Sequence, residues 1–197
     1  KMAKIYDRMG DFNKSLKANK KAQNIFLKLC LKDEKYYHDL IISYCDISVT
    51  YRLQNKLELA LETLYDGYKI IKENNDDYSS ALIILSSDLG IIYEKIKDYP
   101  AAINMFEKSL SLINKSDNLD EFNEIKIICH INMGNIQKLT KNYKAACKSY
   151  VEAVKMTNQH KEFYQHHIIS NINLGQTLCE MHEFDEAIEL YKKVLPI

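Results

Sequence analysis

One pattern of bulky and small residues recurs five times along the chain and limits what it can fold into. Each bulky residue is followed three positions later by a small one, and the bulky positions lie 41 to 45 residues apart. The bulky positions are Phe12, Leu57, Tyr99, Tyr143 and Phe184; the small residues after them are Ser15, Ala60, Ala102, Ala146 and Ala187; and small residues nine positions before them are Ala3, Ser48, Gly90, Gly134 and Gly175. Self-similarity with such a period predicts repeated structural units that stack on one another.

The spacing inside each unit predicts two antiparallel helices. Apolar residues recur every three or four positions, as in Ile92, Ile96 and Tyr99, and Asp98 with Pro100 provides a cap and a first turn for the second helix. Five Gly and two Pro are too few for the turns of a multi-strand fold. Because one hairpin cannot bury its own apolar face, we predict an all-α fold, a right-handed α-solenoid of about five antiparallel helix hairpins. The expected repeats cover residues 1–32, 35–74, 78–115, 120–158 and 161–197 of one solenoid domain.

Short segments of the last two repeats resemble a known family. Residues 132–135 (Asn-Met-Gly-Asn) and 173–176 (Asn-Leu-Gly-Gln) look like the Asn-Leu-Gly-Asn of the first helix of a tetratricopeptide repeat (TPR), and 183–191 looks like the start of its second helix. The repeats here exceed the usual length of about 34 residues. This lengthened form is similar to repeats of kinesin light chains, spindle-orientation adaptors and bacterial peptide-pheromone receptors. Asn19 replaces a bulky residue of later units, which fits either a polar end of the array or a divergent internal repeat.

Charge and cysteine content exclude several classes of protein. The 27 Lys and Arg balance 27 Asp and Glu, so we expect no direct nucleic-acid contact from this region. No apolar run is long enough for a membrane helix. Five widely spaced Cys, an odd number, do not form a secreted disulfide framework and favour a cytoplasmic location. The first residues read as the middle of a helix, so we expect the chain to be part of a longer protein.

No catalytic or metal-binding pattern stands out. The glycines are isolated, so there is no phosphate-binding loop, and neither HExxH nor GxSxG occurs. His160, His166 and His167 fit an exposed helix start better than a metal site. Cys179 and His182 fit a buried Cys beside a loop His better than a zinc site. We therefore predict a non-enzymatic protein with no cofactor and no bound metal.

The first helix of each hairpin should line the concave face of such a solenoid, where a ligand would bind. Counting from the small residue of that helix, the positions two before, one after and four after project onto this face. The predicted peptide-binding residues at these positions are Asp46, Arg52, Asp88, Asn132, Asn135, Lys138, Asn173 and Gln176. The four carboxamides can each donate and accept hydrogen bonds, which suits the backbone of an extended peptide.

Neighbouring residues refine this expectation. Ile128, Ile131, Ile169 and Ile172 flank the carboxamides and can supply apolar pockets. Some TPR proteins clamp acidic C-termini with Lys and Arg on this face, but Asp46 and Asp88 would repel such a ligand. The resemblance implies a protein- or peptide-binding module, such as the sensory domain of a bacterial transcriptional or signalling regulator, in which a homodimer is one expected assembly. The alternative is a scaffold or adaptor that holds a partner without switching.

Overall fold

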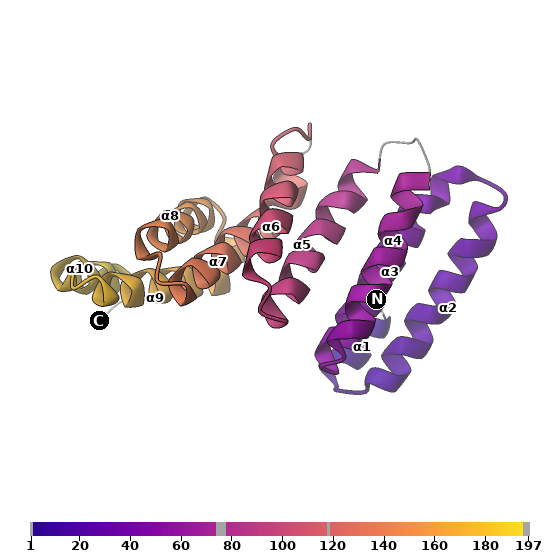
Figure 1. Ribbon diagram of the computed structural model, residues 1–197, viewed down its shortest axis with the longest axis horizontal. Helices are drawn as coiled ribbons and strands as arrows, with labels where there is room; N and C mark the ends of the chain where they lie inside the picture. Colours follow the sequence, from indigo (N-terminus) through magenta and orange to yellow (C-terminus); the bar gives the residue numbers. More distant parts are fainter. Residues whose placement is uncertain (1, 74–77, 118, 195–197) are drawn as a thin grey trace. The chain divides into compact units, whose positions relative to one another are not determined.

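The computed structural model describes residues 2–73, 78–117 and 119–194. The expected repeat boundaries at 1, 74 and 197 and the polar segment 74–77 lie outside the described residues. The described chain forms ten α-helices and three short 3₁₀ helices (Figure 1). The α-helices are α1 (Met2–Arg8), α2 (Phe12–Cys30), α3 (Tyr37–Leu53), α4 (Leu57–Glu73), α5 (Ser79–Lys95), α6 (Tyr99–Ile113), α7 (Asn123–Leu139), α8 (Tyr143–Gln159), α9 (Tyr164–Glu180) and α10 (Phe184–Val194). The 3₁₀ helices (Glu34–Tyr36, Leu119–Phe122 and Lys161–Phe163) precede α3, α7 and α9.

The helices pack as antiparallel hairpins, which confirms the all-α class expected from the repeat (Figure 1). The chain divides into two compact units, 1–105 and 106–197, whose boundary falls within α6. In unit 1, α3 packs against α4 and also against α5, the first helix of the next hairpin. In unit 2, α7 packs against α8 and against α9 in the same way. First helices of successive hairpins therefore lie against each other in both units. None of the described helices is both long enough and apolar enough to span a lipid bilayer.

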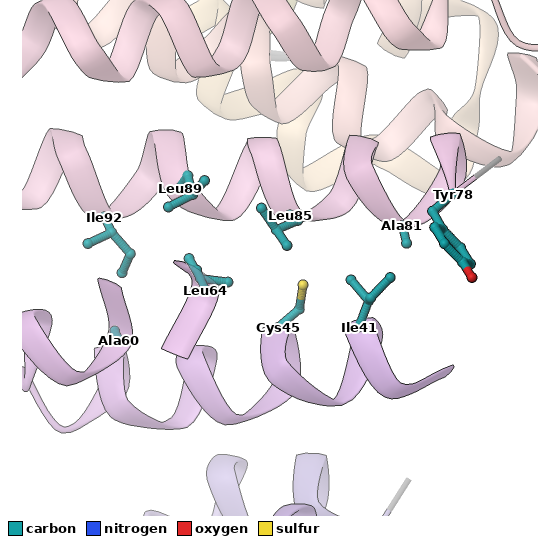
Figure 2. Packing of buried hydrophobic residues seen from close by; sticks show 9 residues of the cluster. All are labelled: Ile41, Cys45, Ala60, Leu64, Tyr78, Ala81, Leu85, Leu89 and Ile92. Atoms are coloured by element: carbon teal, nitrogen blue, oxygen red, sulfur yellow. The ribbon is translucent and has the colours of Figure 1, made fainter. Parts of the chain in front are cut away.

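The small residues of the repeat pattern lie where helices meet. The five small positions that follow the bulky residues are all buried: Ser15, Ala60, Ala102, Ala146 and Ala187. In unit 1, Ala60 and Leu64 of α4 face Leu85, Leu89 and Ile92 of α5, as Figure 2 shows. Methyl-sized side chains allow two helix backbones to approach closely, and the branched side chains fill the remaining space at crystal-like density.

Each hairpin turn contains one residue in the left-handed backbone region: Gly10 (φ 74°), Asn55 (59°), Lys97 (67°), Lys141 (60°) and His182 (61°). The amide after each of them donates to a carbonyl five residues earlier, as Asp98 N does to Tyr93 O at 2.9 Å. The left-handed residue itself donates three residues back, as Lys97 N does to Glu94 O at 3.0 Å. These two bonds are the Schellman motif, which satisfies carbonyls at the end of the first helix. Asp98 then caps α6, since its Oδ1 accepts from Ala101 N at 3.2 Å, as the sequence predicted.

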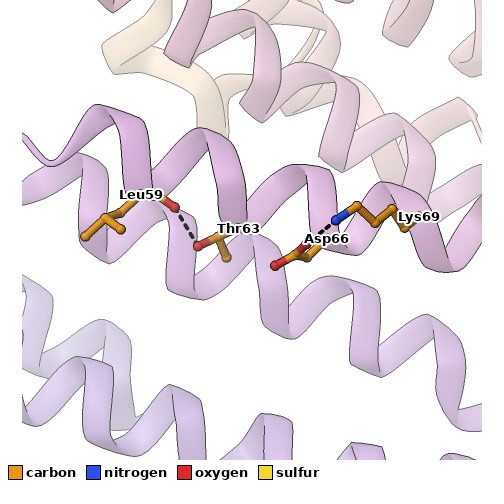
Figure 3. Close-up of polar contacts among 4 residues, drawn as sticks. All are labelled: Leu59, Thr63, Asp66 and Lys69. Atoms are coloured by element: carbon orange, nitrogen blue, oxygen red, sulfur yellow. Dashed lines mark hydrogen bonds and ion pairs between the residues drawn. The ribbon is translucent and has the colours of Figure 1, made fainter.

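The second helix of a hairpin keeps one polar face. On α4, Thr63 donates to the carbonyl of Leu59 at 2.6 Å and Lys69 pairs with Asp66 at 2.8 Å, both at exposed positions (Figure 3). The ion pair contributes about 0.2–0.5 kcal/mol. This face of α4 therefore carries polar side chains toward solvent.

Candidate functional site

A cavity of about 380 Å³ lies within unit 1, and most of its wall comes from the first helices of the hairpins. Its lining is Lys4, Asp7 and Arg8 of α1, Asn19 of α2, Ile42, Cys45, Asp46, Val49 and Leu53 of α3, and Ile84 and Asp88 of α5. We call it the acidic cavity. It brings together two of the predicted ligand-binding residues, Asp46 and Asp88. Arg52 is not part of the lining, but its charge acts on Asp88.

Burial governs the ionisation of the two aspartates. It raises the pKa of Asp88 to about 7, and the charge of Asp46 adds to this rise, whereas Arg52, a hydrogen bond with the Cys45 thiol and the charge of Lys4 oppose it. Burial also raises the pKa of Asp46, with Lys4 again opposing. Both carboxylates are therefore poorly compensated in their charged form.

Cys45 lines the same cavity as these carboxyls and is also a core residue. Its side chain is buried and points from α3 toward Leu85 on α5 (Figure 2). Burial raises the pKa of its thiol well above the ordinary value, and the neighbouring carboxylates Asp88 and Asp46 raise it further. The thiol is therefore neutral at physiological pH and adds no charge to the cavity.

A network of polar groups forms one side of the same cavity. Asn19 Nδ2 donates to the carbonyl of Asp46 and to Thr50 Oγ1, each at 3.3 Å. Thr50 Oγ1 lies 3.4 Å from Asp7 Oδ2, whereas the other oxygen, Asp7 Oδ1, is buried and has no hydrogen-bond partner among the described residues. Asn19 of α2 thus makes hydrogen bonds to α3 where later repeats have a bulky apolar residue. The contact between Thr50 and Asp7 joins α3 to α1 through polar groups as well.

In unit 2 the carboxamides of neighbouring first helices meet directly. Asn135 Oδ1 on α7 accepts one hydrogen bond from Tyr150 Oη at 2.7 Å and another from Asn173 Nδ2 on α9 at 3.2 Å. Both asparagines are half-buried. Two donors thus occupy the carbonyl oxygen of Asn135, so the orientation of its amide is set by the network.

Gly134 explains why Tyr150 reaches Asn135. A Cβ at Gly134 would lie 2.6 Å from a ring carbon of Tyr150, closer than real side chains tolerate. Without that Cβ, the fully buried Tyr150 ring packs against α7 and its hydroxyl meets the next residue of that helix. Gly175 likewise lets the Tyr191 ring approach α9, but the Tyr191 hydroxyl donates to the main-chain carbonyl of Ile172 at 3.4 Å. The glycine of the repeat pattern therefore allows a tyrosine of the second helix to pack on the first, and in α7 this tyrosine also orients the Asn135 amide.

A second pair of predicted residues also meets in unit 2. Lys138 Nζ on α7 donates to Gln176 Oε1 on α9 at 3.1 Å, and both residues line a cavity of about 450 Å³. The same cavity is lined by Tyr143, whose hydroxyl lies 3.5 Å from Glu180 Oε2. Amide and ammonium groups here face an open space between the ends of two helices.

The remaining predicted residues are less engaged. Asn132 and Arg52 are half-buried, and their side chains make no hydrogen bond to another residue in the described part of the chain. Ile169 and Ile172 are 46% and 41% exposed, so they are available to a ligand beside Asn173, whereas Ile131 is buried. The structure thus groups the predicted residues as an aspartate pair in unit 1 and two hydrogen-bonded pairs in unit 2.

The histidines serve structural contacts. His167 is half-buried: its Nδ1 lies 3.0 Å from Thr157 Oγ1 and its Nε2 lies 3.2 Å from Asn171 Nδ2. This differs from the exposed position expected from sequence, because the start of α9 packs against α8. His182 occupies the left-handed position of its turn. Within the described ranges no group of three or more His, Cys, Asp or Glu is placed to hold a metal ion.

Sequence reasoning did not select Lys4 and Asp7, although both line the acidic cavity. The signal was present in the repeat register. Lys4 follows the small residue Ala3 by one position, like Asn135 after Gly134, and Asp7 follows it by four, like Arg52 after Ser48. The bond from the Tyr150 hydroxyl to Asn135 depends on the orientation of the ring and could not be predicted from residue spacing.

The antiparallel hairpins of the chain meet at small residues, and their first helices present polar side chains. These features define the chain as a helical-repeat binding protein. Models of the tetratricopeptide repeat match residues 39–115, 129–160 and 172–197, which together make up more than half of the chain. The chain belongs to the tetratricopeptide-repeat family and is a protein-binding repeat module. No curated protein matches it in sequence.

Several solved structures share this fold at low sequence identity. BtubC from P. vanneervenii is 14% identical, with a TM-score of 0.77 over 93% of this chain and 72% of its own. A putative kinesin light chain from Podospora anserina is 14% identical, with a TM-score of 0.68 over 98% and 90%. Aspartyl phosphate phosphatase F from Bacillus subtilis is 15% identical, with a TM-score of 0.77 over 98% of this chain and 48% of its own. The chain thus spans about half the length of that phosphatase.

Proposed function

We propose that the chain is a peptide-binding module that holds the backbone of an extended peptide on the first helices of its hairpins. The observation that carries this proposal is the bonded amide pair of Asn135 and Asn173. Both amides keep hydrogen-bonding capacity after pairing. Asn135 has both Nδ2 protons to donate, and Asn173 has one proton and its Oδ1 acceptor, because neither group bonds another described residue.

This remaining capacity matches what a peptide backbone requires. An extended segment presents carbonyl oxygens and amide protons in turn, and each must find a partner when it leaves water. Asn135 offers donors to a carbonyl, while Asn173 offers both a donor and an acceptor one helix away. Ile169 and Ile172, exposed on the same helix as Asn173, provide apolar contact for a ligand side chain. A preset amide orientation also lowers the entropy lost on binding.

Selection from a library of random hexapeptides on the immobilised chain tests the proposal. Peptides retained by the wild type should lose about tenfold to a hundredfold in affinity for Asn135→Ala/Asn173→Ala, because two to three hydrogen bonds disappear. Asn173→Ala alone leaves the Tyr150 bond in place and should give part of that loss. The matched control is Asn104→Ala/Asn158→Ala, which removes two exposed amides elsewhere. Equal affinity in the double variant and its control would contradict the assignment.

The wider role follows from the same site. We propose that the module works in the cytoplasm and reports on its peptide, as the sensory part of a bacterial regulator would, either as a monomer or as a homodimer. The alternative, a scaffold that does not switch, uses the same residues. Hydrogen exchange with and without a selected peptide separates them. A sensor should show changes in helices that do not touch the peptide, whereas a scaffold should show protection only at the contact.

A further inference from the structure

The acidic cavity of unit 1 is lined by two kinds of side chain on the same two helices. The aliphatic ones are Ile42, Val49 and Leu53 of α3 and Ile84 of α5. At helical spacing from them come the carboxylates Asp46 of α3 and Asp88 of α5. Its volume of about 380 Å³ lies within the usual range of ligand sites, which is roughly 300–1,000 Å³. A long apolar stem that ends in a positive charge complements both kinds of side chain.

We propose that this cavity binds a lysine or arginine side chain of a peptide segment that lies on unit 1, with its methylene stem against the aliphatic residues and its cationic head at Asp46 and Asp88. Lysine and arginine combine such a stem with such a head, and they bury the stem when the head finds a partner. The inference rests on the proposed function, since it assigns one residue class to a peptide segment bound by unit 1 of the module. It concerns residues separate from the asparagine pair.

The charges around the cavity favour an added cation. Asp46 and Asp88 are both held in a buried setting that disfavours their charged forms. A third aspartate, Asp7, also lines the cavity, and its Oδ1 is buried without a hydrogen-bond partner in the described chain. A charge-assisted hydrogen bond from an ammonium or guanidinium group would compensate these oxygens. Among the described residues, no group of three or more His, Cys, Asp or Glu is placed to hold a metal ion. An organic cation therefore fits this cavity better than a metal ion does.

The resident cations leave room for this ligand. Lys4 and Arg8 belong to the lining but are exposed side chains on α1, and Arg52 lies outside the lining. Lys4 acts on both aspartates and Arg52 acts on Asp88, yet burial still outweighs them, so the pKa of each aspartate stays raised. A ligand cation that enters the cavity replaces solvent next to carboxyls that the chain's own charges compensate only in part.

Cation uptake should be coupled to proton release. The groups that act on Asp88 are Arg52, Asp46, Cys45 and Lys4, and the pKa of Asp88 lies at about 7. Only the deprotonated carboxylate attracts a cation, so affinity rises with pH until Asp88 is fully ionised. Between about pH 6 and pH 8 the ionised fraction, and therefore affinity for a lysine peptide, should rise about tenfold. A peptide without a cation should show no such rise.

The test uses the random hexapeptide library on the whole chain. Peptides retained by the wild type should be enriched in Lys or Arg at one position, and Asp46→Asn/Asp88→Asn should abolish this enrichment. The control Asp39→Asn/Asp66→Asn removes the same charge from the surface, where Asp39 is exposed and Asp66 pairs with Lys69. This control should keep the enrichment in Lys or Arg. Circular dichroism confirms that each variant is folded.

A selected lysine peptide and its norleucine analogue complete the test. The exchange should cost about tenfold or more in affinity for the wild type and little for Asp46→Asn/Asp88→Asn. Retained peptides without Lys or Arg enrichment, or equal binding of the two analogues, would overturn this inference and leave the proposed function intact. If the wild type retains no peptide, the proposed function fails and takes this inference with it.

Discussion

Replacing Asp88 by asparagine should stabilise the protein, and by an amount that grows with pH. The pKa of Asp88 is about 7 in the folded chain against 3.8 as the ordinary value. Well below pH 3.8 the carboxyl is protonated whether the chain is folded or unfolded, so it costs nothing. Between about pH 4 and pH 7 the unfolded chain loses its proton first, and folding stability therefore falls as pH rises. Above pH 7 the full cost remains.

The size of the effect follows from the difference between the pKa of Asp88 in the folded chain and its ordinary value. Holding a buried carboxylate at this pKa corresponds to about 4 kcal/mol at pH 8, and solvent that reaches Asp88 through the acidic cavity lowers this to about 2 kcal/mol. An asparagine side chain at this position carries no charge at any pH. Asp88→Asn should therefore match the wild type at pH 4 and exceed its free energy of unfolding by about 2–4 kcal/mol at pH 8.

Urea unfolding followed by circular dichroism at fixed ionic strength measures this difference at pH 4, 6 and 8. If the two units unfold separately, only the transition of unit 1 should move. Asp39→Asn, on the exposed surface of the same unit in α3, is the control and should show no comparable growth with pH. A wild type more stable than Asp88→Asn at pH 8 would refute the reasoning, because it would mean that Arg52 over-compensates burial.

Other changes address the packing and the turns. Gly134→Ala should destabilise unit 2 by about 1–3 kcal/mol in thermal unfolding, because the new Cβ collides with the Tyr150 ring. Gly67→Ala should cost less, because a Cβ at Gly67 would lie 3.1 Å from the Cβ of Tyr44. Equal costs for the two variants would contradict this account. Lys97→Gly should stabilise the protein by about 0.5–1 kcal/mol, since glycine adopts a positive φ without strain; a lower melting temperature would argue against it. Asn19→Ala should cost about 1–3 kcal/mol by removing two buried hydrogen bonds, whereas exposed Asn13→Ala should be nearly neutral in the same melts.

The repeat pattern predicted the hairpins well because packing depends on side-chain size. A small residue at Ala60 or Ala146 is required wherever two helix backbones approach, and this requirement leaves a trace at regular spacing. Cap residues such as Asp98 also act locally and could be predicted. The division into five repeats of one solenoid stays a prediction, since the chain separates into two compact units.

For the candidate site, the sequence could predict which helix face carries the residues but not which of their side chains are in contact. Register placed Asp46 with Asp88 and Asn135 with Asn173 on first helices, but it could not show which side chains touch. The bond between Asn135 and Tyr150 depends on ring orientation, and the cavity beside Asp88 depends on Asn19 and Asp7 of the first hairpin, where Asn19 replaces the bulky residue of later units. The left-handed turn residues could not be predicted either. Glycine is the usual signal of a positive φ, and Gly10 is the only glycine among these five residues.

The hairpin turns have a practical consequence. Their geometry comes from main-chain hydrogen bonds that Gly, Asn, Lys and His all accommodate. A side chain at such a corner is therefore nearly decoupled from helix packing. Lys97, which is exposed, is thus a convenient anchor for a fluorescent reporter that would follow ligand-induced movement without disturbing the core.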